Sequence, residues 1–127
     1  MDSRYAEIVA VISDYFDGLY HSDTSRLARV FHPQARYVCA TGGTLIHLGM
    51  DEYFPIVDKR PSYAGRGDPR FDRIISIEFA GPVTAFVRAE CVIELKHFTD
   101  FLTLIRIDGG WRIIAKVFHF DFKQVEE

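Results

Sequence analysis

A chain of 127 residues has the length of one small domain, and we expect residues 1–127 to fold as a single unit. The formal net charge of −3 at pH 7 excludes the basic surface of a general nucleic-acid binder. No apolar run approaches the ~18 residues of a membrane span, and Met1–Tyr5 lacks the pattern of a secretory signal. We therefore expect a cytoplasmic protein with neither a nucleic-acid nor a membrane partner.

The first half of the chain predicts three helices and a short hairpin. An amphipathic helix, capped by Asp2 or Ser3, is indicated by apolar residues at helical spacing: Ile8, Ile12, Tyr15, Phe16 and Leu19. A second helix, capped by Ser22 or Asp23, ends before Pro33 because the residue preceding a proline disfavours the helical conformation. Strands over 35–40 and 44–48 follow, and then a third helix from Asp51 with Pro55 in its first turn.

The second half predicts a basic loop over 59–70 and then strands only. The expected strands cover 71–79, 83–96, 98–107 and 111–122, with turns at 80–82 and 108–110. Helices that precede a run of antiparallel strands indicate an α+β fold. We expect the helices to pack on a strongly curved antiparallel sheet, mixed at most at its edge, which encloses a pocket like a cone.

The two cysteines predict buried free thiols rather than a metal site. Cys39 and Cys91 fall in apolar stretches far apart in the sequence, and neither has the spacing of zinc ligands. We expect no metal and no cofactor. The aromatic content of 14% is high and raises the chance of a cavity that binds an apolar or aromatic molecule.

Several segments together resemble the NTF2-like superfamily of cone-shaped domains, which includes ketosteroid-isomerase-like and SnoaL-like proteins. The similarity is closest to the branch known as the “putative lumazine-binding” proteins. It is carried by six segments: Tyr15–Tyr20, Phe31–Pro33, Arg60–Ser62, Phe98–Leu104, Gly110–Ile114 and Lys116–His119. The resemblance implies the cone fold over residues 4–122, and for function it implies a small ligand without naming one.

Asp100 and His119 are the leading candidates for catalysis. A two-residue loop, in either of its two positions within the turn 108–110, would place both side chains on one face of the sheet. A three-residue loop would place them on opposite faces. An imidazole that is held in place by a carboxylate is a familiar general-base arrangement. The resemblance implies such a His/Asp pair in the dehydratase and cyclase members of the superfamily. The alternative is a structural cross-strand hydrogen bond.

Lys116 and His119 exclude each other as pocket residues. Their odd spacing places them on opposite faces of a strand, unless a bulge intervenes. Lys116 is then inward only if Trp111 and His119 are outward.

Seven further residues are candidates for ligand contacts: His32, Arg36, Tyr15, Tyr20, Tyr53, Arg60 and Trp111. For each of these residues a structural role is the alternative: His32 can cap the second helix, the aromatic residues can be plain core, and Arg60 can lie in a solvated loop. The strand that carries Arg36 lacks the carboxylate that the resemblance to steroid isomerases requires, which argues against their proton shuttle.

Three functions remain open from the sequence. The first is binding of a small apolar or aromatic molecule in the cone. The second is a dehydratase, isomerase or cyclase that uses His119 as a base oriented by Asp100. The third is a non-catalytic dimerisation or partner-docking module. A homodimer through the outer face of the sheet is compatible with all three.

Overall fold

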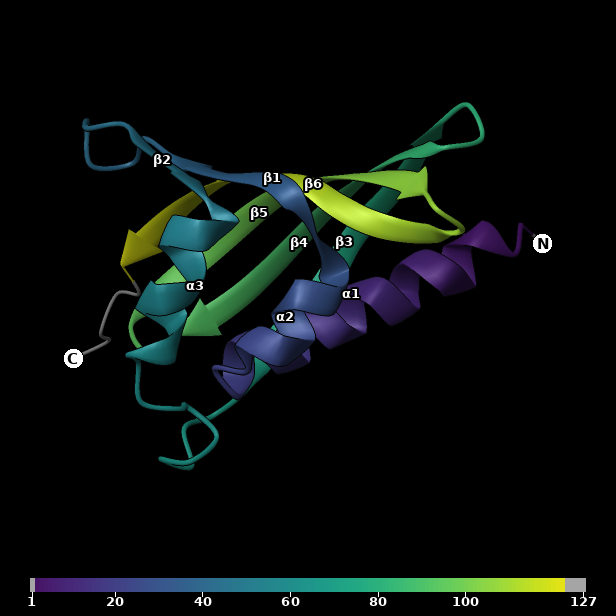
Figure 1. The fold of residues 1–127 in the computed structure, drawn as a ribbon. Coiled ribbons are helices and arrows are strands. Elements are labelled where there is room, and N and C mark those ends of the chain that lie inside the picture. The colour runs from purple at the N-terminus through teal and green to yellow at the C-terminus, as the bar shows by residue number, and fades with distance from the viewer. Residues whose placement is uncertain (1, 123–127) are drawn as a thin grey trace.

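Two helices, two strands, a third helix and four more strands follow one another in the computed structural model, which describes residues 2–122 (Figure 1). The helices are α1 (Arg4–Tyr20), α2 (Thr24–Val30) and α3 (Met50–Asp58). The strands are β1 (Phe31–Cys39), β2 (Ile46–Gly49), β3 (Phe71–Ala80), β4 (Thr84–Ile93), β5 (Lys96–Ile107) and β6 (Gly110–Phe122).

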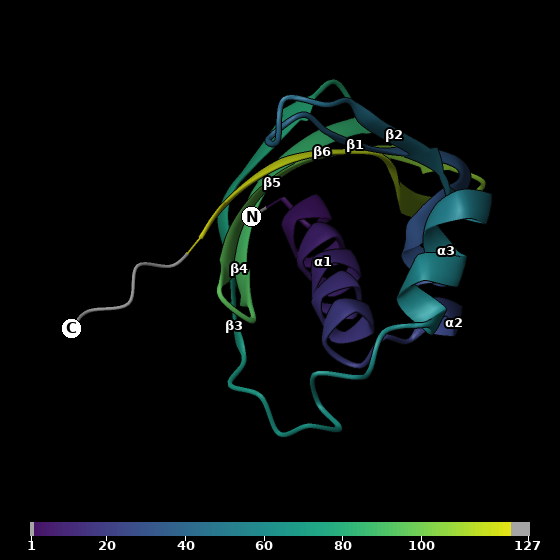
Figure 2. The same cartoon turned by 90° about the vertical axis from the view of Figure 1, so that its left-hand side faces the viewer.

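All six strands of the described chain form one sheet in the order β2-β1-β6-β5-β4-β3. Strands β3 to β6 form the expected antiparallel meander, and the single parallel pair joins β1 to β6. Figure 2 shows the sheet arching over α1, with α2 and α3 closing the other side. The α+β cone expected from the sequence is therefore confirmed, with a sheet that curves around the helices and stays open.

The first two helices pack closely because of a glycine. Ile8, Ile12 and Tyr15 on α1 are completely buried against the sheet, as their spacing predicts. Gly18 faces α2, and a methyl group added at this position would lie 2.6 Å from Leu27 Cδ2. Asp23 caps α2, and its Oδ1 accepts a hydrogen bond from Arg26 N at 3.1 Å. The absence of a side chain at residue 18 therefore sets how near α2 lies to α1.

Several boundaries differ from those that the sequence predicts. Strand β1 already begins at Phe31 and includes Pro33. The expected strand 83–96 ends at Ile93, because Glu94 takes a positive φ of 58° and turns the chain into β5. Helix α3 begins at Met50, so Pro55 lies in its second turn and removes a backbone hydrogen bond there. Within residues 2–122, none of the helices combines the length and apolar character that spanning a bilayer requires.

A bulge in β6 decides which of its side chains face the interior. Next to the turn, Ile107 pairs with Gly110 and Leu104 with Ile113, but the following pair joins Thr103 to Ala115. Ile114 is therefore an extra residue in β6 without a partner of its own. Beyond this point the inward phase of the strand shifts by one residue. Before the bulge, Trp111 and Ile113 are buried, and after it, Lys116 and Phe118 are buried.

Candidate functional site

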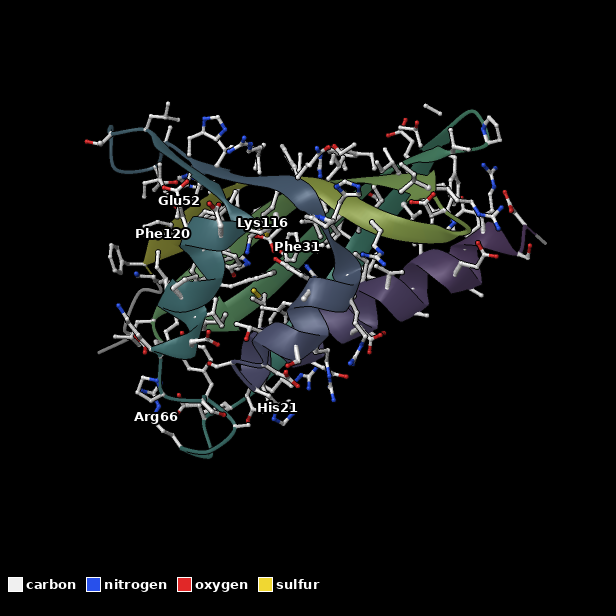
Figure 3. All side chains as sticks on the ribbon, in the orientation of Figure 1. His21, Phe31, Glu52, Arg66, Lys116 and Phe120 are labelled. Carbon is white, nitrogen blue, oxygen red and sulfur yellow. The ribbon has the colours of Figure 1, made fainter. Side chains whose placement is uncertain are left out.

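A lysine side chain lies inside the cone. Lys116 is 5% exposed, and Figure 3 shows it on the inner side of the sheet, between the strands and the helices. Its Nζ lies 5.2 Å from the ring centroid of Tyr15, 5.3 Å from that of Tyr37 and 4.9 Å from that of Phe118. These distances fall within the range of cation–π attraction. Three aromatic rings therefore take over part of the role of water around this ammonium group.

A buried carboxylate lies near the lysine. Asp100 on β5 is completely buried, and Tyr15 on α1 donates a hydrogen bond from its hydroxyl to Asp100 Oδ2 at 2.6 Å. Asp100 Oδ1 is buried and has no hydrogen-bond partner among the described residues. Burial, reinforced by the negative charge of Asp100, raises the pKa of Tyr15 well above its ordinary value. Tyr15 is therefore a fixed hydrogen-bond donor at neutral pH.

Lys116 keeps its positive charge in the interior, and Asp100 is the main group that favours this charge. Burial by itself lowers the pKa of the lysine and is the largest single influence, but Asp100, together with smaller contributions from Tyr53, Tyr37 and Cys91, raises the net pKa above the ordinary value. Within residues 2–122, no direct ion pair of 4.0 Å or less joins the two groups. The Lys116 ammonium and the Asp100 carboxylate thus attract each other across a gap, and Oδ1 of Asp100 is left without a hydrogen-bond donor.

A narrow crevice leads from the rim of the cone to Lys116. Its volume is about 40 Å³, which suffices for a water molecule and is far below the ~300–1,000 Å³ of typical ligand pockets. The residues that line it are Leu19, Tyr37, Tyr53, Arg60, Cys91, Ile93, Phe98 and Lys116. Aliphatic and aromatic side chains of the core fill the interior, so the roomy cavity expected from the sequence is reduced here to a crevice.

Aromatic rings and a thiol make up the wall of this crevice. Tyr37 and Tyr53 stack with ring centroids 4.4 Å apart and planes 24° apart. Burial raises the pKa of Tyr53, although the nearby Lys116 and Arg60 oppose the shift. Burial, followed by the charge of Asp100, raises the pKa of Cys91 to about 12. Cys91 is therefore a protonated thiol at neutral pH and a poor nucleophile.

The expected pairing of Asp100 with His119 does not form. Asp100 lies opposite Phe118, while His119 lies opposite Thr99 and is exposed on the outside. His119 Nδ1 lies 2.8 Å from Thr41 Oγ1, and its Nε2 lies 2.9 Å from Asp121 Oδ1. The loop in the turn 108–110 has two residues, Asp108 and Gly109, which is one of the two loop positions considered from the sequence. The bulge at Ile114, however, moves the later side chains of β6 to the opposite faces of the sheet. Lys116 takes the inward position, and Trp111 is inward as well, contrary to the sequence argument.

Four other candidates lie outside the crevice. His32 is half-buried, and its Nδ1 accepts a hydrogen bond from Gln34 N at 3.0 Å instead of capping α2. Arg36 is exposed.

The remaining two of these candidates are held by other parts of the protein. The Tyr20 hydroxyl donates to the backbone oxygen of Asp68 at 2.5 Å. Trp111 Nε1 donates to Glu7 Oε2 at 2.9 Å. The structure thus brings together Tyr15, Tyr53, Arg60, Asp100 and Lys116, and separates His32, Arg36, Tyr20, Trp111 and His119 from them.

Sequence reasoning misses part of the crevice. Tyr37, Ile93 and Phe98 are not among the candidates that it yields, and it treats Cys91 only as a buried thiol. The alternation of β4 does place Cys91 on the same face as the buried Ala89, which is a usable signal. The hydrogen bond between Tyr15 and Asp100 joins residues 85 positions apart, and no local pattern indicates it.

A larger hollow of about 910 Å³ lies on the outer face of β3 and β4. Its charged groups are already matched: Glu90 pairs with Arg73 and with His97, and Arg66 pairs with Asp68 and Glu94. Among the described residues, no group of three His, Cys, Asp or Glu side chains gathers to hold a metal ion. The crevice at Lys116 is therefore the better candidate, since the buried Asp100 in the same interior has an oxygen without a hydrogen-bond partner.

Comparison with known proteins supports the fold and places the chain in a family. A curated relative, the aldolase FrzH of Cladobotryum sp, is 24% identical over 119 residues, which cover 92% of this chain and 91% of the aldolase. An NTF2-like protein of unknown function from Silicibacter pomeroyi has a TM-score of 0.82 at 25% identity, with 94% of this chain and 97% of that chain covered.

More distant structures share the fold alone. A ketosteroid isomerase-like protein from Erwinia carotovora atroseptica has a TM-score of 0.74 at 14% identity, with 94% of this chain and 98% of that chain covered.

Residues 3–119 match the family described as “Putative lumazine-binding”. With nearly the whole described chain matched and the cone fold in place, the protein belongs to this NTF2-like family.

Proposed function

We propose that this domain binds a small, partly aromatic carbonyl compound inside its cone, at the end where Lys116 lies. The observation that carries the proposal is a buried oxygen of Asp100 without a hydrogen-bond donor, in the same interior as the buried, positively charged side chain of Lys116. Removing such groups from water costs several kcal/mol each unless partners compensate. Buried polar groups without partners are rare in proteins and call for an explanation, and a bound ligand supplies one.

The chemistry of the crevice suggests what the ligand contains. Lys116 is positively charged and donates hydrogen bonds, so it suits a carbonyl oxygen or an oxyanion. Asp100 Oδ1 accepts, so it suits a hydroxyl or N–H group on the same ligand. The stacked rings of Tyr37 and Tyr53 offer apolar surface to a flat molecule.

Binding requires the crevice to widen. The half-buried side chains among its lining residues are Tyr37, Arg60, Ile93 and Phe98, so the opening lies on their side. The deeper residues Tyr53, Cys91 and Lys116 are buried. Rotamer changes at the half-buried positions are the smallest rearrangement that admits a ring, and such changes are common on binding.

The test is a titration of ¹⁵N-labelled protein with 4-hydroxyacetophenone, a flat ketone that carries a hydroxyl group. We expect shifts in the amide signals of Tyr37, Tyr53 and Phe98, and affinity about tenfold lower in Lys116→Met and in Asp100→Asn. Glu90→Gln, in the outer hollow, is the control and should bind like the wild type. Shifts confined to the outer hollow, or unchanged affinity in Lys116→Met, would contradict the proposal.

A second candidate function is an aldol-type reaction at the same site. The observation that favours it is the similarity to a protein named as an aldolase over 92% of this chain. In such a reaction a base removes the α-proton of a ketone, the enolate attacks a second carbonyl carbon, and the resulting alkoxide takes up a proton. Asp100 would act as the base, and the Lys116 ammonium would stabilise the enolate oxygen.

The charge of Lys116 decides between two modes of aldol chemistry. Its raised pKa keeps the amine protonated and therefore unable to attack a carbonyl and form an imine. We expect the α-protons of 4-hydroxyacetophenone to exchange with D₂O in the presence of the wild type and not of Asp100→Asn. Borohydride added during the reaction should leave the protein mass unchanged. A reduced adduct on Lys116 would overturn charge stabilisation in favour of an imine mechanism.

A further inference from the structure

One arginine beside the crevice differs from the others in its loop. The segment between α3 and β3 carries Arg60, Arg66 and Arg70. Arg66 and Arg70 each form ion pairs with two carboxylates, at N–O distances between 2.7 and 3.2 Å. Among the described residues, no carboxylate lies within 4.0 Å of the Arg60 guanidinium. Arg60 is half-buried and lines the crevice that leads to Lys116.

The charges of the residues that line the crevice, taken together with Asp100, do not balance. Arg60 and Lys116 are positive, Asp100 is negative, and the residues that line the crevice include no carboxylate. Among these three groups, one positive charge is therefore left without a counter-charge. Arg60 also acts on its surroundings: burial raises the pKa of the Tyr63 hydroxyl, and the charge of Arg60 opposes this shift.

We infer that the ligand of this site is a monoanion, an aromatic keto acid whose carboxylate binds Arg60 while its carbonyl oxygen faces Lys116. This inference rests on the proposed function, because it names the chemical class of the same ligand. A guanidinium binds a carboxylate through two parallel hydrogen bonds, which a single ammonium does not match. The carboxylate supplies the negative charge that the crevice lacks.

The depth of the two cations sets the orientation of the ligand. Arg60 is half-buried at the rim, whereas Lys116 is 5% exposed at the inner end. The carboxylate therefore stays at the rim, where desolvation costs least, and the carbonyl group enters first. The ring lies between them, against Tyr37 and Tyr53.

Two compounds of nearly equal shape test the inference. 4-Acetylbenzoate carries a ketone and a carboxylate on opposite sides of one ring, and 4-acetylbenzamide replaces the carboxylate by a neutral amide. Isothermal titration calorimetry at low salt is expected to show that the wild type binds the benzoate at least tenfold more tightly. Arg60→Gln should lose this preference, because its affinity for the benzoate should fall more than its affinity for the benzamide, while Arg60→Lys should retain part of the preference.

Lys59→Gln is the matched control, since Lys59 is an exposed neighbouring cation that does not line the crevice. It should keep the preference for the benzoate. A preference that survives in Arg60→Gln, or that is lost equally in Lys59→Gln, overturns the role of Arg60 and leaves the binding site at Lys116 intact. If the wild type binds neither compound, the proposed function fails and the inference fails with it.

Discussion

Replacing Lys116 by methionine tests whether the positive charge of Lys116 stabilises the fold by compensating the buried carboxylate of Asp100. Methionine has a similar length and packs well against aromatic rings, so the substitution removes the charge with little change in volume. Asp100 then keeps only the hydrogen bond from Tyr15 and loses the positive charge that faces it. An uncompensated carboxylate remains at a position with no exposure to water.

The expected loss of stability is about 2 kcal/mol at pH 7. Removing one partner of a buried charge pair costs about 3–5 kcal/mol, and the absence of a direct contact places this pair at the lower end. Methionine–aromatic contacts return up to about 1 kcal/mol. The double variant Lys116→Met/Asp100→Asn removes both charges and should lie within about 1 kcal/mol of the wild type, because a buried pair is seldom better than neutral groups.

Urea denaturation followed by circular dichroism measures these differences. Lys96→Met is the control, since Lys96 Nζ also lies over an aromatic ring, 4.9 Å from the centroid of Phe120, but is only half-buried. Its effect should stay within about 0.5 kcal/mol. The reasoning fails if Lys116→Met is as stable as the wild type, or if the double variant is less stable than Lys116→Met alone.

The difference in stability between the wild type and Lys116→Met should also depend on pH, which gives the denaturation experiment a second readout. The pKa of Lys116 in the folded protein lies above its ordinary value of 10.5, so the folded state holds this proton more tightly than the unfolded state. The stabilisation is therefore complete below pH 10.5 and is lost as the pH rises above that value. We expect the wild type to approach Lys116→Met in stability by up to about 1.4 kcal/mol per pH unit in this range. A gap that stays constant up to pH 12 would contradict the assignment.

Three further outcomes are expected from single substitutions. Tyr15→Phe leaves both oxygens of Asp100 without a donor and should cost about 1–3 kcal/mol in urea denaturation; a change below about 0.5 kcal/mol would show that the hydrogen bond is not needed. Gly18→Ala places a methyl group 2.6 Å from Leu27 Cδ2. It should therefore lower the stability of the fold by about 1–2 kcal/mol, even though alanine favours helices. A stabilised variant would refute the close packing of α1 and α2. The homodimer expected from the sequence stays a prediction. Phe101 is 41% exposed on the outer face of the sheet, so Phe101→Glu should convert a dimer to a monomer in analytical ultracentrifugation. A monomeric wild type would contradict the expected homodimer.

Much of the fold follows from patterns that are local in the sequence. The apolar spacing of α1 and the Asp108–Gly109 loop depend on neighbouring residues only. Both loop residues take positive φ, 53° and 80°, as a tight hairpin turn requires. The order of helices before strands then leads to the α+β class, so the amino-acid sequence suffices to predict these features.

The candidate site depends on contacts that no local pattern reveals. The sequence points to both Tyr15 and Asp100, but it pairs Asp100 with the wrong partner. The Ile113–Ala115 segment of β6 is apolar throughout, so no alternation with polar residues marks the bulge at Ile114. Without that bulge, His119 and not Lys116 would have been the natural neighbour of Asp100.

The sequence by itself determined the elements, their order and the class of fold, because helical periodicity, strand alternation and turn chemistry act over a few residues. The tertiary structure alone decided which polar residues share the interior. A sheet that curves around α1 needs an irregularity in its long strands, and one extra residue in a strand moves every later side chain to the opposite face. In this protein that single residue places a lysine inside the cone and a histidine outside it.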